Sequence, residues 1–200
     1  MSEKVTIKKG LFCNPLPISN NNWAKDYPYA PEVSVEVKHD SATMTLLFKV
    51  REQYTKAEIK ETNGRVWTDS CVAFFISFGD EGYYNLETTC AGVELLGFKD
   101  SEGVTTHAPE SLIDLILKKG TYVGNSFPEK EGDNSWQIEI QIPCSAFFHH
   151  KLESFDGIKA RGNFFKCGDG LKVPHFVTWA PVRPPSPDYH RPEFFLPVDF

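Results

Sequence analysis

The chain has few cysteines, no long apolar run and no excess of positive charge. Its five cysteines lie far apart, so none of the spacings typical of zinc or dithiol redox motifs is present. An odd number of widely spaced cysteines favours buried, reduced thiols and hence a reducing compartment. No apolar run reaches the length of a membrane span, which argues against a membrane partner.

The N-terminus and the charge balance argue against two further classes of protein, those with a signal peptide and those that bind nucleic acids. The opening MSEKVTIKKGLF lacks the apolar stretch of a signal peptide, so the chain as written is expected in the cytoplasm. A chain whose leader had been removed would look the same and would be extracytoplasmic. Lys and Arg total 21 against 27 Asp and Glu, a net charge of −6. A nucleic-acid partner would call for a basic stripe instead. Nothing in the sequence indicates an oligomeric state.

Aromatic residues are plentiful, with 16 Phe, 7 Tyr and 4 Trp among 200 residues. Such side chains favour strands, where they pack on a pleated surface. Gly and Pro, 14 of each, are numerous enough to separate many short elements. We expect a single domain over residues 1–200, of which residues 1–20 form an N-terminal extension, because a chain of this length buries roughly 70% of its unfolded surface.

Alternating apolar and polar residues predict about nine strands. Val33, Val35 and Val37 alternate with polar residues, and residues 43–50 do the same after an HDSA turn, so the two segments form a hairpin. Residues 71–78 are apolar on both faces, as in a central strand. The other predicted strands span 83–90, 92–98, 135–143, 160–168, 175–181 and 192–200.

Little helix is expected. The segment PESLIDLILKKG at 109–120 has the early Pro and Glu, late Lys and final Gly of a helix, although its apolar run also suits a strand. One or two helical turns are predicted at 144–152. This pattern indicates an all-β fold, an antiparallel β-sandwich or jelly roll with one or two short helices.

Two tryptophans lie at strand ends far apart in the sequence. Trp67 precedes the strand at 71–78, and Trp179 ends the strand at 175–181. An indole offers a flat apolar face to the C–H groups of a pyranose ring. Two such faces held apart by a rigid sheet would form a slot for a sugar ring. For each tryptophan the alternative is a structural place in the core.

Six segments carry a resemblance to a known family. They are, in order, YAPEVSVEVKHD, GRVWTDSCVAFFISF, GYYNLETTCAGVELLGF, GNFFKCGD, PHFVTWAPV and PDYHRPEFF. This set resembles the family 9 carbohydrate-binding modules, and more narrowly the stand-alone family-9-like proteins of Bacteroides-type bacteria. The resemblance implies a jelly-roll sandwich related to DOMON domains. It also implies a glycan end held between Trp67 and Trp179, as in xylanase-borne members.

The same resemblance implies structural calcium, for which the loops FGDEG and CGDG are candidates, with no ligand residue singled out. One departure stands out. The chain has Ala73 where family members usually carry an acidic residue, which removes a charged hydrogen bond typically worth ~1.5–3 kcal/mol. Asp69, two residues after the tryptophan, could cover part of that role.

Strand parity adds two polar candidates near Ala73. Asn85 and Glu87 share the more polar face of the strand at 83–90, and they lie near Ala73 if this strand pairs with 71–78. An exposed sheet face without a ligand is the alternative.

Four more candidates lie toward the C-terminus. Asn163 and Lys166 flank two phenylalanines, and Lys166 could donate to a sugar hydroxyl or extend its stem toward solvent. His190 and Arg191 lie in the proline-rich loop at 181–192 and could reach over the slot. For Arg191, a carboxylate pair that anchors the loop is the favoured alternative.

These residues predict non-catalytic binding of a carbohydrate. A glycoside hydrolase, or an accessory subunit in polysaccharide breakdown, is the alternative, with Glu87 and either Asp69 or Glu139 as the carboxylate pair, although no motif singles out catalytic residues. A scaffold domain with a decayed sugar site is a further alternative. Haem is disfavoured because Met44 is expected in the core and no C-x-x-C-H motif is present. No cofactor besides calcium is expected.

Overall fold

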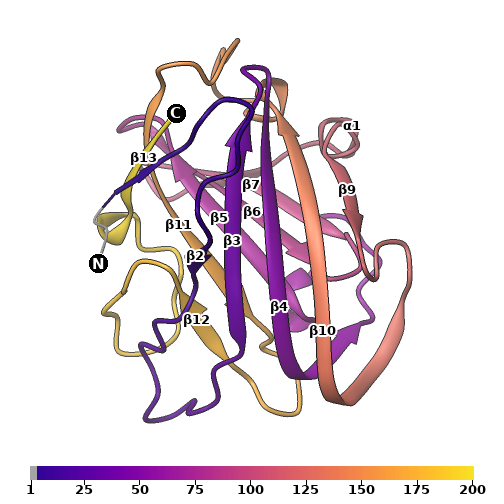
Figure 1. Ribbon diagram of the computed structural model, residues 1–200. Helices are drawn as coiled ribbons and strands as arrows, with labels where there is room; N and C mark the ends of the chain where they lie inside the picture. The colour runs from indigo at the N-terminus through magenta and orange to yellow at the C-terminus, as the bar shows by residue number, and fades with distance from the viewer. Residues whose placement is uncertain (1–3) are drawn as a thin grey trace.

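The computed structural model describes residues 4–200, which form two β-sheets packed face to face (Figure 1). The sheet nearer the viewer in Figure 1 has five strands in the order β2–β3–β4–β10–β9. Its strands are β2 (Leu16–Pro17), β3 (Glu32–His39), β4 (Thr43–Ala57), β9 (Leu117–Gly120) and β10 (Phe127–Pro143).

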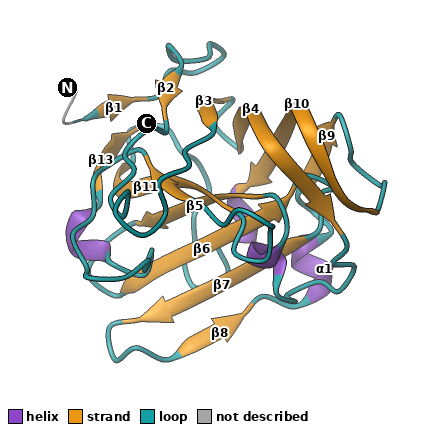
Figure 2. Cartoon of the chain, turned by 90° about the horizontal axis from the view of Figure 1, so that it is seen from below, coloured by secondary structure: helices purple, strands orange, loops and turns teal. Residues whose placement is uncertain are grey.

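The second sheet has eight strands in the order β1–β13–β11–β5–β6–β7–β8, with β12 paired to β11 outside this path. Figure 2 shows β5, β6, β7 and β8 side by side. The strands are β1 (Val5–Thr6), β5 (Cys71–Ser77), β6 (Gly82–Thr89), β7 (Glu94–Asp100), β8 (Thr105–His107), β11 (Lys159–Cys167), β12 (Phe176–Thr178) and β13 (Leu196–Asp199). The all-β sandwich predicted from the sequence is confirmed.

Among the residues that the structure describes, helix is confined to single turns. They are α1 (Glu110–Ile113) and the 3-10 turns η1 (Val66–Thr68), η2 (Cys144–Ala146) and η3 (Pro192–Phe194). No helix within the described residues is long and apolar enough to cross a membrane.

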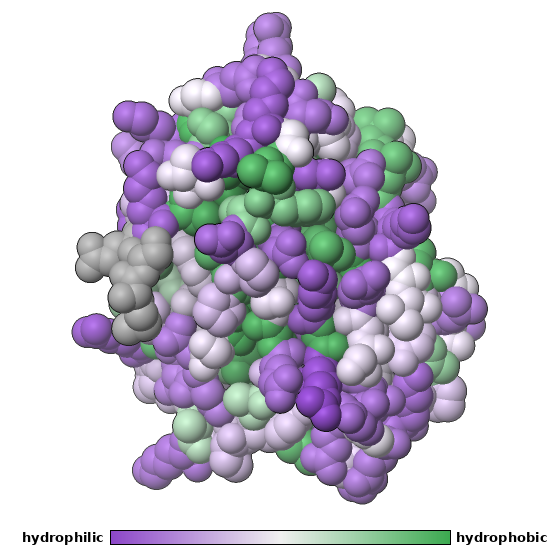
Figure 3. All heavy atoms as spheres, in the orientation of Figure 1, coloured by the Kyte–Doolittle hydropathy of each residue, from purple (hydrophilic) through white to green (hydrophobic). Residues whose placement is uncertain are grey.

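The core lies between the sheets and is rich in aromatic rings. Phe74 of β5 and Phe164 of β11 stack with ring centroids 4.6 Å apart, and Phe48 of β4 meets Phe164 edge-on from the other sheet. All three rings are almost fully buried. The outer side of the five-stranded sheet, by contrast, is largely covered by hydrophilic side chains (Figure 3).

The helix predicted at 109–120 is wrong over most of its length. Only residues 110–113 are helical, and residues 117–120 form β9, an edge strand antiparallel to β10. The apolar residues of this segment do not all share one helical face: Ile113 and Ile116 are buried, whereas Leu115 and Leu117 are exposed. Pairing with the long strand β10 satisfies the backbone groups that a short helix would leave unpaired.

The described part of the expected N-terminal extension belongs to the sandwich. β1 pairs in parallel with β13 of the large sheet, and β2 pairs with β3 of the small one. Between and beside these strands, Ile7 and Ile18 are buried in the core. The segment therefore crosses from one sheet to the other along one side of the sandwich.

Candidate functional site

The outer face of the eight-stranded sheet carries polar side chains at its centre. β5 and β6 pair antiparallel, with Ala73 opposite Glu87 and Phe75 opposite Asn85. Directly paired residues in such a ladder project to the same side of the sheet. Because the alternate residues Phe74 and Leu86 lie in the core, these four side chains point away from it. The predicted proximity of Asn85 and Glu87 to Ala73 is therefore confirmed.

A cavity of about 500 Å³ opens above this part of the sheet. Its floor is buried and largely apolar, with one polar pair. The floor residues are Phe75, Asn85, Glu87, Leu95, Cys167 and Phe176. Trp67 and its neighbours Asn63, Gly64 and Arg65 line one side, and residues 187–190 of the proline-rich loop line another. An apolar cavity with a few convergent polar groups is the usual form of a small-molecule site.

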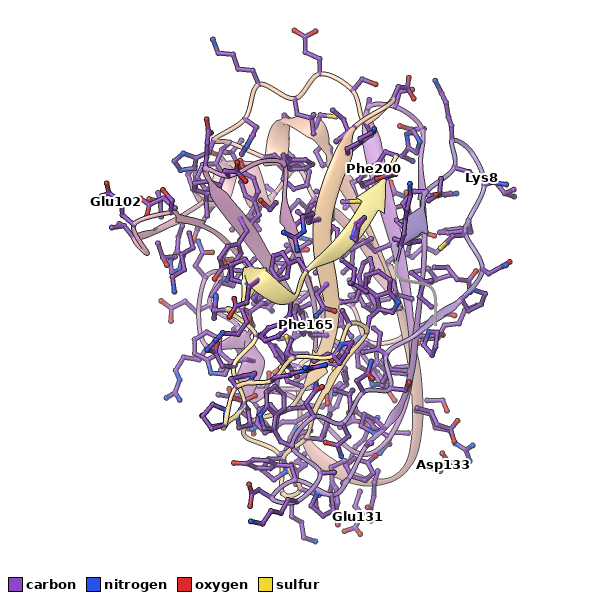
Figure 4. All side chains as sticks on the ribbon, turned by 90° about the vertical axis from the view of Figure 1, so that its left-hand side faces the viewer. Lys8, Glu102, Glu131, Asp133, Phe165 and Phe200 are labelled. Atoms are coloured by element: carbon purple, nitrogen blue, oxygen red, sulfur yellow. The ribbon has the colours of Figure 1, made fainter. Side chains whose placement is uncertain are left out.

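The proline-rich loop is fixed against the sheet by aromatic contacts. Tyr189 stacks on Phe165 at a centroid distance of 4.2 Å, and its hydroxyl donates to the Lys166 carbonyl at 2.9 Å. Trp23 Nε1 donates to the Pro184 carbonyl at 2.9 Å from the N-terminal part of the chain. In Figure 4, Phe165 lies in the middle of the molecule beside the yellow C-terminal segment. This wall of the cavity is therefore held in place.

The opposite wall is the segment that carries Trp67. Its indole is half-buried, and the Arg65 guanidinium lies 6.0 Å from the indole centroid. The Trp67 carbonyl accepts a hydrogen bond from the Asp169 backbone N–H at 3.0 Å. Asn63, in the left-handed region at φ 58°, ties the segment to β7, because its side chain accepts from the Leu96 N–H and donates to the Ala108 carbonyl.

The polar pair on the floor has unused hydrogen-bonding capacity. Asn85 Nδ2 donates to Glu87 Oε1 at 3.0 Å, while the buried Asn85 Oδ1 has no hydrogen-bond partner. Gly97, opposite Asn85 on β7, makes room for this amide, since a Cβ there would lie 2.6 Å from Asn85 Oδ1. Burial raises the pKa of Glu87 to about 7, against the lowering effect of the Asn85 hydrogen bond. The floor therefore offers acceptors to a ligand rich in donors.

Comparison with known proteins decides the family. The profile of carbohydrate-binding family 9 matches residues 7–200. This chain belongs to that family. Among curated proteins nothing matches it.

Two solved structures resemble this family 9 protein over 98% of its chain. A proposed carbohydrate-binding protein from Bacteroides uniformis ATCC 8492 has 36% identity, a TM-score of 0.94 and 98% of its own chain covered. A family 9 carbohydrate-binding module from Caldicellulosiruptor kristjanssonii, in complex with cellotriose, has 10% identity, a TM-score of 0.54 and 92% of its chain covered. The second likeness shows the shared fold.

Four of the nine residues predicted from the sequence line the cavity of this family 9 protein: Trp67, Asn85, Glu87 and His190. His190 is positioned from two sides. Its Nδ1 lies 2.7 Å from the Tyr83 hydroxyl, and its backbone N–H donates to Asp188 Oδ1 at 2.9 Å.

Trp179 does not face Trp67. It is only 9% exposed and packs edge-on against Phe164 in the core, at a centroid distance of 5.5 Å. Its backbone N–H donates to the Phe164 carbonyl at 2.9 Å, which fixes the chain at this point. The structural alternative holds for this tryptophan, and the predicted slot between the two indoles is not formed.

Asp69 and Asn163 are buried and organise the backbone. Asp69 Oδ2 accepts from the N–H groups of Glu58 and Ile59, at 2.7 and 2.8 Å, where the chain leaves β4. Asn163 exchanges hydrogen bonds with Ala180, donating to its carbonyl at 3.0 Å and accepting from its N–H at 2.8 Å. Neither residue lines the cavity.

Lys166 lies on the inner face, because it shares the face of Phe164 on β11. Its Nζ lies 2.7 Å from Glu52 Oε2 and 2.7 Å from His175 Nε2. Trp136 Nε1 donates to the other Glu52 oxygen at 2.7 Å. We call Glu52, Trp136, Lys166 and His175 the inner cluster; all four are buried. Burial, with the Lys166 charge, holds the pKa of His175 well below its usual range, so its ring is neutral and accepts from Lys166.

Arg191 does not line the cavity and is paired with carboxylates near it in the sequence. Its guanidinium bonds Glu193 Oε1, with Nε at 2.7 Å, and lies 3.8 Å from Asp188. The carboxylate pair favoured for Arg191 is therefore present.

The carboxylate pairs suggested for hydrolysis do not face each other across the cavity. Asp69 is occupied by the turn after β4, and Glu139 lies on β10 of the other sheet, where Gln141 donates to it. Neither residue lines the cavity with Glu87.

The described residues contain no cluster of side chains suited to bind calcium. Ca²⁺ takes six to eight oxygen ligands. Within residues 4–200, no three His, Cys, Asp or Glu side chains are grouped in a way that would hold a metal ion. Of the two candidate loops, CGDG contributes Asp169 to the wall of the cavity. Structural calcium stays a prediction of the family resemblance.

The sequence reasoning missed several cavity residues. Asp188 and Tyr189 lie just before the predicted residue His190 in the segment PDYHRPEFF, so the sequence indicates this segment but not these two residues. Asn63, Leu95, His107 and Phe176 come from four other segments. No spacing in the sequence connects them.

Proposed function

We propose that this family 9 protein binds a carbohydrate, without hydrolysing it, in the cavity on the outer face of the eight-stranded sheet. The observation that carries the proposal is the joint placement of a half-buried indole and the buried pair Asn85 and Glu87 in one cavity. An indole face suits the C–H side of a sugar ring. The carboxyl and amide oxygens suit the hydroxyl groups around its edge.

The sugar ring would stack on Trp67, with Tyr189 and His190 forming the other wall in place of Trp179. Tyr189 is held by its stack on Phe165 and by its hydroxyl, so this wall needs little ordering when a ligand binds. Glu87 uses Oε1 to accept from Asn85, which leaves Oε2 for a hydroxyl of the ligand. Glu87 is opposite Ala73 on the neighbouring strand, so its carboxyl can replace the acidic residue that the family usually has there.

Isothermal titration against glucose, xylose, cellotriose and xylotriose tests this function. Cellotriose belongs in the panel because a family 9 module of the same fold is solved with it. We expect measurable heat with at least one sugar and a shift in indole fluorescence. Trp67→Ala should abolish both signals, because it removes the stacking face.

Phe12→Ala is a matched control, since that ring lies away from the cavity, under Lys38 of β3. The control should bind like the wild type. If no sugar gives heat and the fluorescence never shifts, the cavity does not bind sugars, and the decayed-site alternative takes its place.

One observation favours a hydrolase as the second candidate. Glu87 and Asp169 both line the cavity, and loss of hydration raises their pKa values to about 7 and about 6. Carboxyl groups with separated, raised pKa values are typical of general acids and bases. Turnover of aryl glycosides that is lost in Glu87→Gln would support this candidate, whereas sugar binding without turnover would contradict it.

A further inference from the structure

Two cysteines that are distant in the sequence face each other at one end of the sheet. Cys71 begins β5 and Cys167 ends β11, and the antiparallel register pairs them directly. Their side chains therefore project to the same side of the sheet. Both residues are buried, and their Sγ atoms donate to backbone carbonyls, Cys71 to that of Val72 and Cys167 to that of Trp67.

The backbone spacing at such a pair suits a disulfide. Directly paired residues of antiparallel strands have Cα atoms roughly 4.5 or 5.5 Å apart. A disulfide requires a Cα separation of about 4.4–6.8 Å. Joining the two sulfurs thus needs side-chain rotation and a small local adjustment, with no rearrangement of the strands.

Only one of the two thiols is reachable from outside. Cys167 lines the cavity, whereas Cys71 does not and has no exposed surface. The Cys167 Sγ also donates a weak hydrogen bond, at 3.8 Å, to the carbonyl of Trp67. The thiol pair therefore lies beside the wall that carries the indole.

The other three cysteines have different neighbours. Cys90 Sγ donates to the Lys56 carbonyl and Cys144 Sγ to the Ser41 carbonyl, while Cys13 Sγ accepts from the Val37 N–H. In the strand registers of the described residues, none of these three is paired with another cysteine.

We propose that Cys71 and Cys167 are a site of disulfide formation, oxidised through the cavity by a small disulfide compound. The thiolate of Cys167 attacks one sulfur of the compound, giving a mixed disulfide and one free thiol product. The thiolate of Cys71 then attacks the Cys167 sulfur and releases the second half of the compound as a thiol. Two cysteine thiols and one disulfide thus become one protein disulfide and two small thiols.

The experiment uses hydroxyethyl disulfide, a small neutral probe, on the folded full chain. After reaction and acid quenching, the thiols are counted in denaturant and the cross-linked peptides are mapped by mass spectrometry. We expect the count to fall by two from the initial five, with Cys71 and Cys167 in one cross-linked peptide pair.

Serine variants separate the two steps. Cys71→Ser should stop at a mixed disulfide on Cys167, and Cys167→Ser should leave Cys71 unreacted because Cys71 is sealed. Cys144→Ser is the control and should still form the disulfide. Far-ultraviolet circular dichroism of each variant verifies that it is folded. A folded wild type that retains all five thiols, or that links a different pair, would overturn the proposal.

Oxidation does not require that a sugar binds, so this test stands apart from the proposed function. If a sugar that binds also slows the reaction of Cys167, the probe and the sugar share the cavity. If oxidation proceeds at the same rate with a bound sugar, the thiol site survives and the sugar lies elsewhere.

Discussion

The eight-stranded sheet has a buried polar group on each face, and the two differ in whether their charged side chains are paired. In the inner cluster, Lys166 Nζ contacts Glu52, His175 and the Cys167 carbonyl, and Trp136 donates to Glu52. On the outer face, Asn85 donates to Glu87 and Asn85 Oδ1 has no hydrogen-bond partner, while Glu87 forms no ion pair with a described residue.

This difference separates structural from ligand-binding polar groups. A buried charge that is paired and hydrogen-bonded links the two sheets, and removing one member leaves the other uncompensated. A buried acceptor without a donor costs free energy in the unbound protein, and a ligand hydroxyl can supply the missing bond. Burial alone does not distinguish Lys166 from Glu87 as a candidate, whereas the buried counter-ion beside Lys166 does.

Breaking the inner cluster should have the largest effect on stability. Lys166→Met keeps most of the side-chain volume but leaves the Glu52 carboxylate buried without its cation, and we expect a loss of about 3–5 kcal/mol in the free energy of unfolding. Urea denaturation measures it. The double variant Glu52→Gln with Lys166→Met should recover part of the loss. Lys172→Met, in an exposed pair with Glu131, is the matched control and should change little.

The two tryptophans provide the second test. Trp179→Ala empties a site in the core and should cost about 3–5 kcal/mol of stability. Trp67→Ala should cost much less stability and instead remove sugar binding, because its ring is only half-buried at the cavity. Thermal unfolding and titration of both variants check the contrast. Equal losses of melting temperature would place both rings in structural roles.

Glu87→Gln should change both sugar affinity and the pH dependence of stability. The folded pKa of Glu87, about 7, lies above its ordinary value of 4.5. Between these values the unfolded chain has lost the proton and the folded chain keeps it, so wild-type stability falls as pH rises from 4.5 to 7. This destabilising contribution amounts to about 3 kcal/mol in the free energy of unfolding, and it is complete once the pH exceeds the folded pKa.

In Glu87→Gln that contribution disappears, so the variant gains stability relative to wild type over the same pH interval. Glu94, whose pKa burial also raises to about 7, acts equally in both proteins and cancels in the difference. Sugar affinity should fall roughly 10- to 100-fold, as expected for a lost bond to a charged group. Unfolding at several pH values and titration measure the two effects, and parallel stability curves would contradict this account.

Arg191→Ala should have the smallest effect. Its partners Glu193 and Asp188 are partly exposed, as is Arg191 itself, and such pairs contribute little. Melting temperature and sugar affinity should both stay near wild-type values. A marked loss of affinity would show that the pair positions His190 over the cavity.

The strands were predictable from two hydrophobic patterns in the sequence, a period of two in some segments and a continuous short apolar run in another. Val33, Val35 and Val37 alternate and lie in the core as β3, and the run at 71–78 is the central strand β5. The segment at 109–120 was not predictable, because its short apolar run suits either type of element and the pairing with β10 decides.

The site was predictable only where one face of a strand is distinctly polar, as for Asn85 and Glu87. On β11 both faces are buried, so alternation alone could not tell that Lys166 points inward with Phe164. Trp179 follows the short strand β12, whose three residues are too few to show from the sequence which face of the sheet a side chain occupies. The remaining cavity residues come from loops whose positions depend on contacts such as Tyr189 with Phe165.

The N-terminal segment, which lends one strand to each sheet, has a practical consequence for expression. β1 covers the side of β13, and β2 covers the side of β3. A chain shortened to begin near residue 20 would present two bare strand edges and lose the side chains of Ile7 and Ile18. Open edges recruit strands from neighbouring copies, so such a truncation favours self-association and precipitation. A purification tag is therefore better tolerated when the first two strands are kept intact behind it.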